Sequence, residues 1–283
     1  IVEQTGTPLI IPAKEKERVA TAVDEARAAF YELGRASHSD IDTFYRLFAS
    51  FLADDAVWKK IQEVNSEDVK DAKTRGRSTT RLIADEKCRQ NMIDGLHDQL
   101  HAESTRGKSL GNVSHEGWEV ELIQSEMGVV GFVFEGRPNV IADATGVLKS
   151  GNTVVFRVGQ DALQTAHAIM NLALYPALEQ SGLPKHCVNL IDSKAHSAGW
   201  ALFSNKQMAL VIARGSGAAV RTLGGLANQH GIPVSLHGTG GAWMLIDQTI
   251  SEDALKGAIV GSLDRKVCNT LNTIVIERAA CER

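Results

Sequence analysis

The sequence predicts an α/β fold in which a helical segment precedes a doubly wound, mostly parallel sheet. From about Met127 onward, apolar runs of strand length alternate with segments of helix length. These runs are nearly continuous, as expected for strands that helices cover on both faces. A strand–helix–strand order implies right-handed crossovers and ligand binding at the carboxyl ends of the strands.

The first hundred residues are predicted to be helical. Apolar residues recur at helical spacing, namely Val19, Val23, Ala26 and Phe30, then Ile41, Phe44, Leu47 and Phe51. Ser39 or Asp40 is the expected cap of the second helix. His97 and His101 lie four residues apart and would share one helical face, but without a third ligand nearby a solvated or capping role is favoured and no metal is expected.

Residues 105–126 change character. Three glycines interrupt the helical pattern. Apolar and polar residues then alternate in Trp118–Ile123, as in a strand with one solvent-exposed face. We interpret this stretch as a β excursion from the main domain and as a candidate oligomer contact.

The α/β alternation follows in chain order. The expected elements are a strand at 129–134, a helix from about Pro138 to Ser150, a strand at 153–157, a long helix at 162–181 closed by Gly182, and strands at 188–191 and 208–212. After the last of these, Gly215 and Ser216 lead into a helix, so backbone amides and a hydroxyl could face a phosphate, although such a sequence is often only a turn. Arg157, at a strand end, could hold a ribose or a 2′-phosphate; a surface salt bridge is the alternative.

Cys268 stands where a covalent nucleophile would be needed. Arg265 and Lys266 precede it, Asn269 follows it, and a buried strand is expected at 273–276. Neighbouring positive charge lowers the pKa of a thiol and raises the thiolate fraction. The residue is therefore a candidate to attack an acyl carbon, whereas a lone cysteine in such a place is otherwise a small hydrophobe.

Composition excludes some classes of function. The 283 residues are 43% hydrophobic and 23% charged, with a net charge of -4, so no electrostatic case exists for nucleic acid. No apolar run is long enough to span a membrane, no signal peptide is evident, and a cytoplasmic protein with four free cysteines is expected. The chain starts without Met and stops just after a strand, which suggests a fragment.

Four ordered motifs resemble the glutamate-5-semialdehyde dehydrogenase (γ-glutamyl phosphate reductase) family, a branch of the aldehyde dehydrogenase superfamily. They are Gly128–Gly131 running into Glu135–Val140, then Leu148–Asn152, Ile212–Gly215, and Val267–Asn269 with Leu271–Thr273. The resemblance covers the chain from about Met127 onward; the helical first hundred residues are similar only loosely.

The resemblance implies an NADPH-dependent reduction of L-glutamyl 5-phosphate to the semialdehyde, in proline biosynthesis, through a thioester on Cys268. It implies that the Asn139 side chain and the Cys268 backbone amide stabilise the oxyanion. It also assigns substrate binding to Arg137 and Asn269, and cofactor binding to Arg157, Gly215 and Ser216. A small acyl phosphate is the expected partner, and the full-length protein is expected to be a homo-oligomer.

Two departures from the family pattern stand out. Val158 replaces a glycine after Arg157, and 238–243 lacks the polar and reactive side chains usual there. His237 stands where many aldehyde dehydrogenases place a glutamate base, and could act as a base or pair with backbone. Two alternatives remain open: a related reductase of another acyl phosphate or acyl thioester in secondary metabolism, and a non-catalytic nucleotide-binding homologue.

The predicted organisation follows from these motifs. A helical part of the cofactor domain comprises 1–104, the β excursion 105–126, a dinucleotide-binding α/β core 127–235, and the apparently truncated start of a catalytic domain 236–283.

Overall fold

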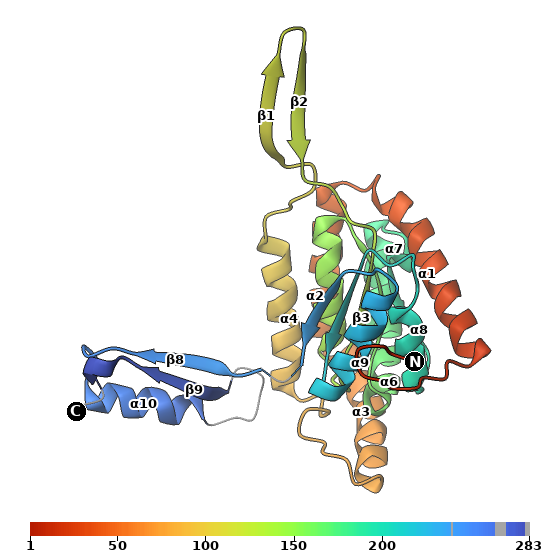
Figure 1. The fold of residues 1–283 in the computed structure, drawn as a ribbon. Coiled ribbons are helices and arrows are strands. Elements are labelled where there is room, and N and C mark those ends of the chain that lie inside the picture. The colour runs from red at the N-terminus through yellow and green to blue at the C-terminus, as the bar shows by residue number, and fades with distance from the viewer. Residues whose placement is uncertain (239, 264–269, 281–283) are drawn as a thin grey trace.

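The computed structural model describes residues 1–238, 240–263 and 270–280. Its centre is a five-stranded parallel sheet in the order β5-β4-β3-β6-β7 (Figure 1). The strands are β3 (Val129–Val133), β4 (Thr153–Arg157), β5 (Val188–Leu190), β6 (Leu210–Arg214) and β7 (Val234–His237). The chain moves outward from β3 through β4 to β5, then returns to the other side of β3 for β6. The order therefore reverses between β3 and β6, where open α/β sheets bind ligands.

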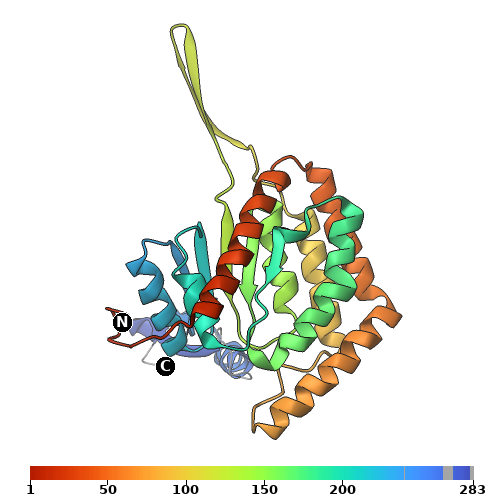
Figure 2. The ribbon, with the colours of Figure 1, turned by 90° about the vertical axis from the view of Figure 1, so that its right-hand side faces the viewer.

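Helices cover both faces of the sheet, as predicted. One layer consists of α1 (Ala13–Leu33), α8 (His196–Phe203) and α9 (Gly217–Gln229), with Val129 and Val155 in its core. The other contains α2 (His38–Ala53), α4 (Glu86–His101) and the helices around 140–181, with Val130 and Phe156 in its core. Successive strand residues enter opposite cores because side chains alternate across a strand. Figure 2 shows α1 lying along the sheet.

The N-terminal region is helical as predicted, and includes α3 (Asp55–Thr74). The cap of α2 differs from the expectation. Ser37 is the N-cap: its hydroxyl accepts a hydrogen bond from the Asp40 amide at 3.2 Å, and the Asp40 carboxylate accepts one from the Ser37 amide at 2.8 Å. Asp40 is thus the reciprocal partner in a capping box, and Ser39 has neither role.

The crossover helices are less regular than predicted. The segment after β3 forms a short α5 (Val140–Thr145) and a 3-10 turn, Gly146–Ser150. The predicted long helix divides into α6 (Leu163–Ile169), a π-helical turn (Met170–Leu174) and α7 (Tyr175–Ser181), with Gly182 as the left-handed cap. Pro176 accounts for the π turn, because proline offers no amide to the carbonyl four residues earlier.

The β excursion is a two-stranded antiparallel hairpin, β1 (Ser109–His115) and β2 (Trp118–Ile123), which projects from the body (Figures 1 and 2). The strand at 118–123 is confirmed. The expectation that only one face of the strand is exposed to solvent is wrong, because every residue of both strands is exposed. A hairpin that touches no other layer has no buried face to offer.

After β7 the chain enters a separate small unit. It contains a parallel pair, β8 (Ala242–Ile246) and β9 (Leu271–Ile276), and α10 (Glu252–Ser262) beside them (Figure 1). The strand predicted at 273–276 is confirmed and starts two residues earlier, but the expectation that it is buried is wrong, because Ile274, Val275 and Ile276 are exposed. In the described parts of the chain, no helix has the length and apolar character needed to cross a membrane.

Candidate functional site

Two cavities open at the carboxyl ends of β3 and β6. One, of about 420 Å³, lies between α8 and α9 and is called the α8–α9 cavity. The other, of about 650 Å³, lies between the start of α5 and the end of β7 and is called the α5–β7 cavity. Both volumes are typical of small-molecule sites. The cavities share Phe134, Glu135, Arg214 and Gly215 as lining residues, so they adjoin each other at the switch point of the sheet.

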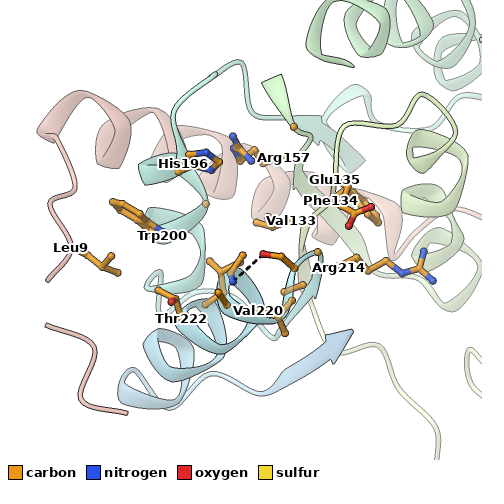
Figure 3. A pocket seen from close by; sticks show the side chains of 18 of the residues that line it. Leu9, Val133, Phe134, Glu135, Arg157, His196, Trp200, Arg214, Val220 and Thr222 are labelled. Carbon is orange, nitrogen blue, oxygen red and sulfur yellow. Dashed lines mark hydrogen bonds between the residues drawn. The ribbon is translucent and has the colours of Figure 1, made fainter. Parts of the chain in front are cut away.

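The turn from β6 into α9 forms one wall of the α8–α9 cavity (Figure 3). Ser216 is the N-cap of α9, and its hydroxyl oxygen accepts a hydrogen bond from the Ala219 amide at 3.4 Å. The Gly215 amide donates to the His237 carbonyl at 3.2 Å. A Cβ built on Gly215 would meet nothing within 4 Å, so the protein itself leaves room there for a ligand beside a helix N-terminus.

Arg157 lies at another end of the same cavity. Its side chain is buried, with 4% of the residue exposed, and its Nε and Nη2 donate to the carbonyls of Ala195 and Lys194 at 3.2 and 3.3 Å. Burial lowers the pKa of the guanidinium, and Glu15 opposes this. The alternative of a surface salt bridge is wrong, because the side chain points into the protein.

The valine after Arg157 does not disturb this arrangement. Val158 is fully buried in the core on the opposite face of the sheet, because adjacent residues of a strand point to opposite sides. Gly159 then passes directly over Gly136: a Cβ on Gly159 would lie 2.6 Å from the Gly136 amide nitrogen. No side chain fits between these two backbones.

Residues absent from the sequence-based prediction line the middle of the α8–α9 cavity. Leu9, from the N-terminal segment, Trp200, from α8, and Val220, from α9, line this part of the cavity (Figure 3). His196 lies beside Arg157, and burial, together with Arg157 and Arg77, lowers its pKa. These residues come from three separate segments. In the sequence, the one signal for these cavity residues is that His196 and Trp200 follow shortly after the β5 strand.

Arg137 and Asn139 both line the α5–β7 cavity. The Arg137 guanidinium pairs with Glu135 at 2.6 Å, and Arg81 approaches the same carboxylate oxygen at 3.6 Å. Asn139 is the first residue before α5, but its side chain makes no capping hydrogen bond there. It also lines a smaller cavity of about 120 Å³ between α4 and α5.

An ion pair joins the walls of the α5–β7 cavity. Arg214, at the end of β6, lies 3.2 Å from the Asp143 carboxylate of α5. Burial raises the pKa of Asp143, and Arg214 opposes this shift. The pair therefore connects the turn at Gly215 with the helix that follows Asn139.

His237 closes β7 and lines the α5–β7 cavity, with its Nε2 atom 3.1 Å from the Ser235 hydroxyl. That contact leaves both interpretations of its role open. Cys268 and Asn269 lie outside the described residues, as do Arg265 and Lys266. Within residues 1–238, 240–263 and 270–280, no three His, Cys, Asp or Glu side chains are grouped so as to hold a metal ion.

Comparisons with known proteins agree with this architecture. A model described as the aldehyde dehydrogenase family matches residues 5–283. Among curated proteins, the chain is 31% identical over 223 residues to γ-glutamyl phosphate reductase of Bacillus subtilis, covering 76% of this chain and 53% of that protein. It is 31% identical over 220 residues to γ-glutamyl phosphate reductase 2 of Bacillus licheniformis, covering 75% and 51%. The chain thus spans about half the length of these relatives.

Solved structures show the same fold. The crystal structure of γ-glutamyl phosphate reductase from Thermotoga maritima superposes with a TM-score of 0.83 at 24% identity, covering 94% of this chain and 65% of that one. The Saccharomyces cerevisiae protein of the same name gives 0.68 at 24% identity, covering 93% and 66%. With a family model matched along nearly its whole length and the sheet and cavities described above, the chain belongs to the aldehyde dehydrogenase family.

Proposed function

We propose that this chain forms the cofactor-binding part and the start of the catalytic part of an NADPH-dependent reductase. The substrate is L-glutamyl 5-phosphate, the products are glutamate 5-semialdehyde and phosphate, and the reaction belongs to proline biosynthesis. The observation that carries this proposal is that the two cavities adjoin at Phe134 and Gly215, because a cofactor in one would then lie next to a substrate in the other. The names of the relatives support the choice of substrate.

The residues of the α8–α9 cavity fit a dinucleotide. Gly215 and Ser216, at the start of a thirteen-residue helix, would hold the pyrophosphate. Trp200 and Leu9 offer apolar surface to the adenine, and Arg157 would hold the 2′-phosphate that distinguishes NADPH from NADH. When bound, NADPH supplies the hydride that reduces the acyl group.

The chemistry in the α5–β7 cavity would rest on Cys268 and Asn139. The Cys268 thiolate attacks the acyl carbon, a C–S bond forms, and the C–O bond to phosphate breaks. After reduction the C–S bond breaks, which releases the aldehyde and regenerates the thiolate. Each tetrahedral intermediate carries an oxyanion, toward which the Asn139 amide and the backbone N–H of Cys268 would donate. We assign substrate binding to Arg137 and Asn269.

The remaining parts would serve assembly. We propose that the hairpin β1–β2 contacts another copy in a homo-oligomer, since it exposes Leu110, Val113, Trp118, Val120 and Leu122 on a ribbon that no described layer of its own chain covers. The small unit around β8 would begin the catalytic domain. The full-length protein would act in the cytoplasm.

Replacing Cys268 in the full-length protein tests the proposal. Cys268→Ala should abolish both aldehyde formation and phosphate release, while NADPH affinity stays within a few fold. Retained turnover would exclude covalent catalysis at this position. Release of a thiol from acyl thioesters, without phosphate release from acyl phosphates, would identify the related reductase instead.

Alkylation supplies a second readout and a control within the same chain. Burial raises the pKa of the Cys88 thiol to about 11, helped by Asp85, and burial also raises the pKa of Cys187. At pH 7.5 the thiolate fraction of Cys88 is below about 0.1%, and it rises only as the pH approaches 11. Iodoacetamide at pH 7.5 should therefore label Cys268 and spare these two, as read by peptide mass mapping. An unlabelled Cys268 in a protein that binds NADPH without turnover would favour the non-catalytic homologue.

A further inference from the structure

The first nine residues of the chain lie against α9 and contribute one wall of the α8–α9 cavity. Thr7 and Leu9 line this cavity, whereas its other described lining belongs to the sheet, to α8 and α9, and to the turns between them. Figure 3 shows Leu9 on a stretch of chain separate from both helices. This segment therefore reaches the cavity from outside the strand–helix units that form the rest of it.

A glycine of α9 makes room for the start of this segment. Val2 is fully buried in the core that it shares with α9. A Cβ built on Gly225 would lie 2.7 Å from a methyl carbon of Val2 and 3.0 Å from the side-chain oxygen of Gln4. The Gln229 side chain, one turn further along α9, donates to the Ile1 carbonyl at 3.2 Å. We call the space that Gly225 leaves for Val2 the Gly225 notch.

A hydrogen-bonded turn connects the Gly225 notch to the cavity wall. The Val2 amide donates to the Thr7 carbonyl at 2.9 Å, and the Gly6 amide donates to the Val2 carbonyl at 2.8 Å. Gly6 has a φ of 66°, a left-handed conformation that favours glycine. The hydroxyls of Thr5 and Thr7 lie 2.8 Å apart and are also hydrogen-bonded. Because these bonds close the turn, a displacement of Val2 would also displace Thr7 and, two residues later, Leu9.

The segment is also held beyond Leu9. Leu9 and Ile11 pack against the same core as Val2. Pro12 then precedes α1 as its N-cap residue, and the proline ring fixes its φ angle. Neither Val2 nor Gly225 is among the described residues that line the cavity. Any effect of these two residues on a ligand would therefore act through the position of Thr7 and Leu9.

The cavity wall beside this segment suits a flat heteroaromatic ring. Four apolar side chains and two threonines belong to the lining, namely Leu9, Trp200, Val220 and Leu223 with Thr7 and Thr222. In Figure 3, Leu9 and Trp200 lie away from Glu135 and Arg214, which border the α5–β7 cavity. Apolar and aromatic surfaces bind flat rings. In the proposed cofactor, the nicotinamide must face the substrate, so the ring at the far end is adenine.

From this geometry we infer that residues 1–9 form a wall of the adenine site, and that Val2 and Gly225 are positioning residues for Leu9. The Gly225 notch holds Val2, the turn fixes Thr7 relative to Val2, and Leu9 contacts the base. The inference deepens the proposed function and rests on it for the identity of the ligand. It gives cofactor affinity a contribution from residues that do not contact the cofactor.

The experiment is a calorimetric titration of the full-length protein with 2′,5′-ADP, which carries adenosine and the 2′-phosphate but no nicotinamide. Gly225→Ala should weaken its binding by about threefold to tenfold, the equivalent of losing one or two methylene contacts. The reason is that the added methyl group displaces Val2 from the Gly225 notch. Where Gly225→Ala does not fold, Val2→Gly empties the notch from the other side and should give the same loss.

Gly224→Ala is the matched control. It adds the same methyl group to the same helix, so both variants share the gain in helix propensity. Its Cβ would meet the terminal carbons of Leu236 instead of the N-terminal segment. Leu236 is 41% exposed, so its side chain has room to turn away. The affinity of Gly224→Ala for 2′,5′-ADP should stay near that of wild type, with thermal unfolding as the check that both variants fold.

Two double variants show whether Gly225 acts through Val2 and Leu9. Val2→Ala removes the methyl carbon that the new Cβ meets, so combining it with Gly225→Ala should recover at least half of the lost affinity. Leu9→Ala alone should weaken 2′,5′-ADP by about tenfold, as expected for lost apolar contact. Adding Gly225→Ala to Leu9→Ala should then reduce the affinity little further, because residues that act through one contact are not additive.

Several results would overturn the inference: wild-type affinity in Gly225→Ala, an equal loss in Gly224→Ala, additive losses for Gly225→Ala and Leu9→Ala, or no binding of 2′,5′-ADP to wild type. The proposed function fails separately. If wild type binds 2′,5′-ADP but reduces no L-glutamyl 5-phosphate, the substrate assignment is lost while the titrations still decide the role of the segment.

Discussion

The two cavities are built in different ways, although they meet at the same edge of one sheet. Local junctions form most of the α8–α9 cavity: a strand that ends at Arg157, a turn at Gly215, and the helices that follow. Long-range contacts form the α5–β7 cavity, which brings Arg81 from the N-terminal region to Arg137 and His237. Features set by a few consecutive residues can be found in a sequence. Features set by distant segments need the fold.

Removing Asn139 is the sharpest test of the α5–β7 cavity. Asn139→Ala should lower kcat by about a hundredfold to a thousandfold, because one donor to the oxyanion is lost. The fold should tolerate the change, since this side chain makes no capping hydrogen bond to α5. Steady-state kinetics with unchanged NADPH affinity and unchanged thermal unfolding would support the assignment. A kcat near that of wild type would remove Asn139 from the catalytic residues.

Arg157 tests the α8–α9 cavity through cofactor choice. Arg157→Ala should weaken NADPH more than NADH, by about tenfold to a hundredfold, because a charge-assisted hydrogen bond contributes about 1.5 to 3 kcal/mol. Two backbone carbonyls also lose a donor in this variant, so Arg157→Lys serves as the milder change and NADH as the internal reference. Parallel fluorescence titrations decide the matter. An equal loss of affinity for both cofactors, or no loss for either, would show that Arg157 does not recognise the 2′-phosphate.

Gly215 tests the same cavity at the pyrophosphate, where selectivity should not change. Gly215→Val should weaken NADPH and NADH alike by about tenfold, the equivalent of losing about 1.5 kcal/mol of hydrogen bonding to a charged group. The backbone conformation is not restricted to glycine, and an added Cβ has open space, so the free energy of unfolding should stay the same. Gly215→Ala should have a smaller effect. Unchanged titrations for the valine variant would place the pyrophosphate elsewhere.

The sequence predicted the central sheet well because its strands are short apolar runs between strong boundary signals. The strand at 153–157 starts and ends as predicted, and Gly182 closes the long crossover helix with a left-handed conformation. The turn at Gly215 was equally visible, since a strand, two small residues and a helix follow one another directly. The roles of Gly215 and Ser216 stay predictions.

Other features could not be read from local patterns. Alternation in Trp118–Ile123 indicated a strand but not the absence of a neighbouring layer, so the predicted buried face does not exist. Trp200 and Leu9 meet across a cavity only because the N-terminal segment lies near α8 and α9. Cys268 was identified by its motif and its charged neighbours, and its role stays a prediction.

The close approach of Gly159 to Gly136 limits how this protein can evolve. Any side chain at position 159 would press on the backbone that leads to Arg137, so a change made there to adapt one ligand site would displace the other. Under the proposed function, adaptation to a different cofactor would be easier at positions that line the α8–α9 cavity without such a backbone contact, such as His196. A saturation library of both positions should show this asymmetry, with nearly every substitution lost at 159 and many retained at 196.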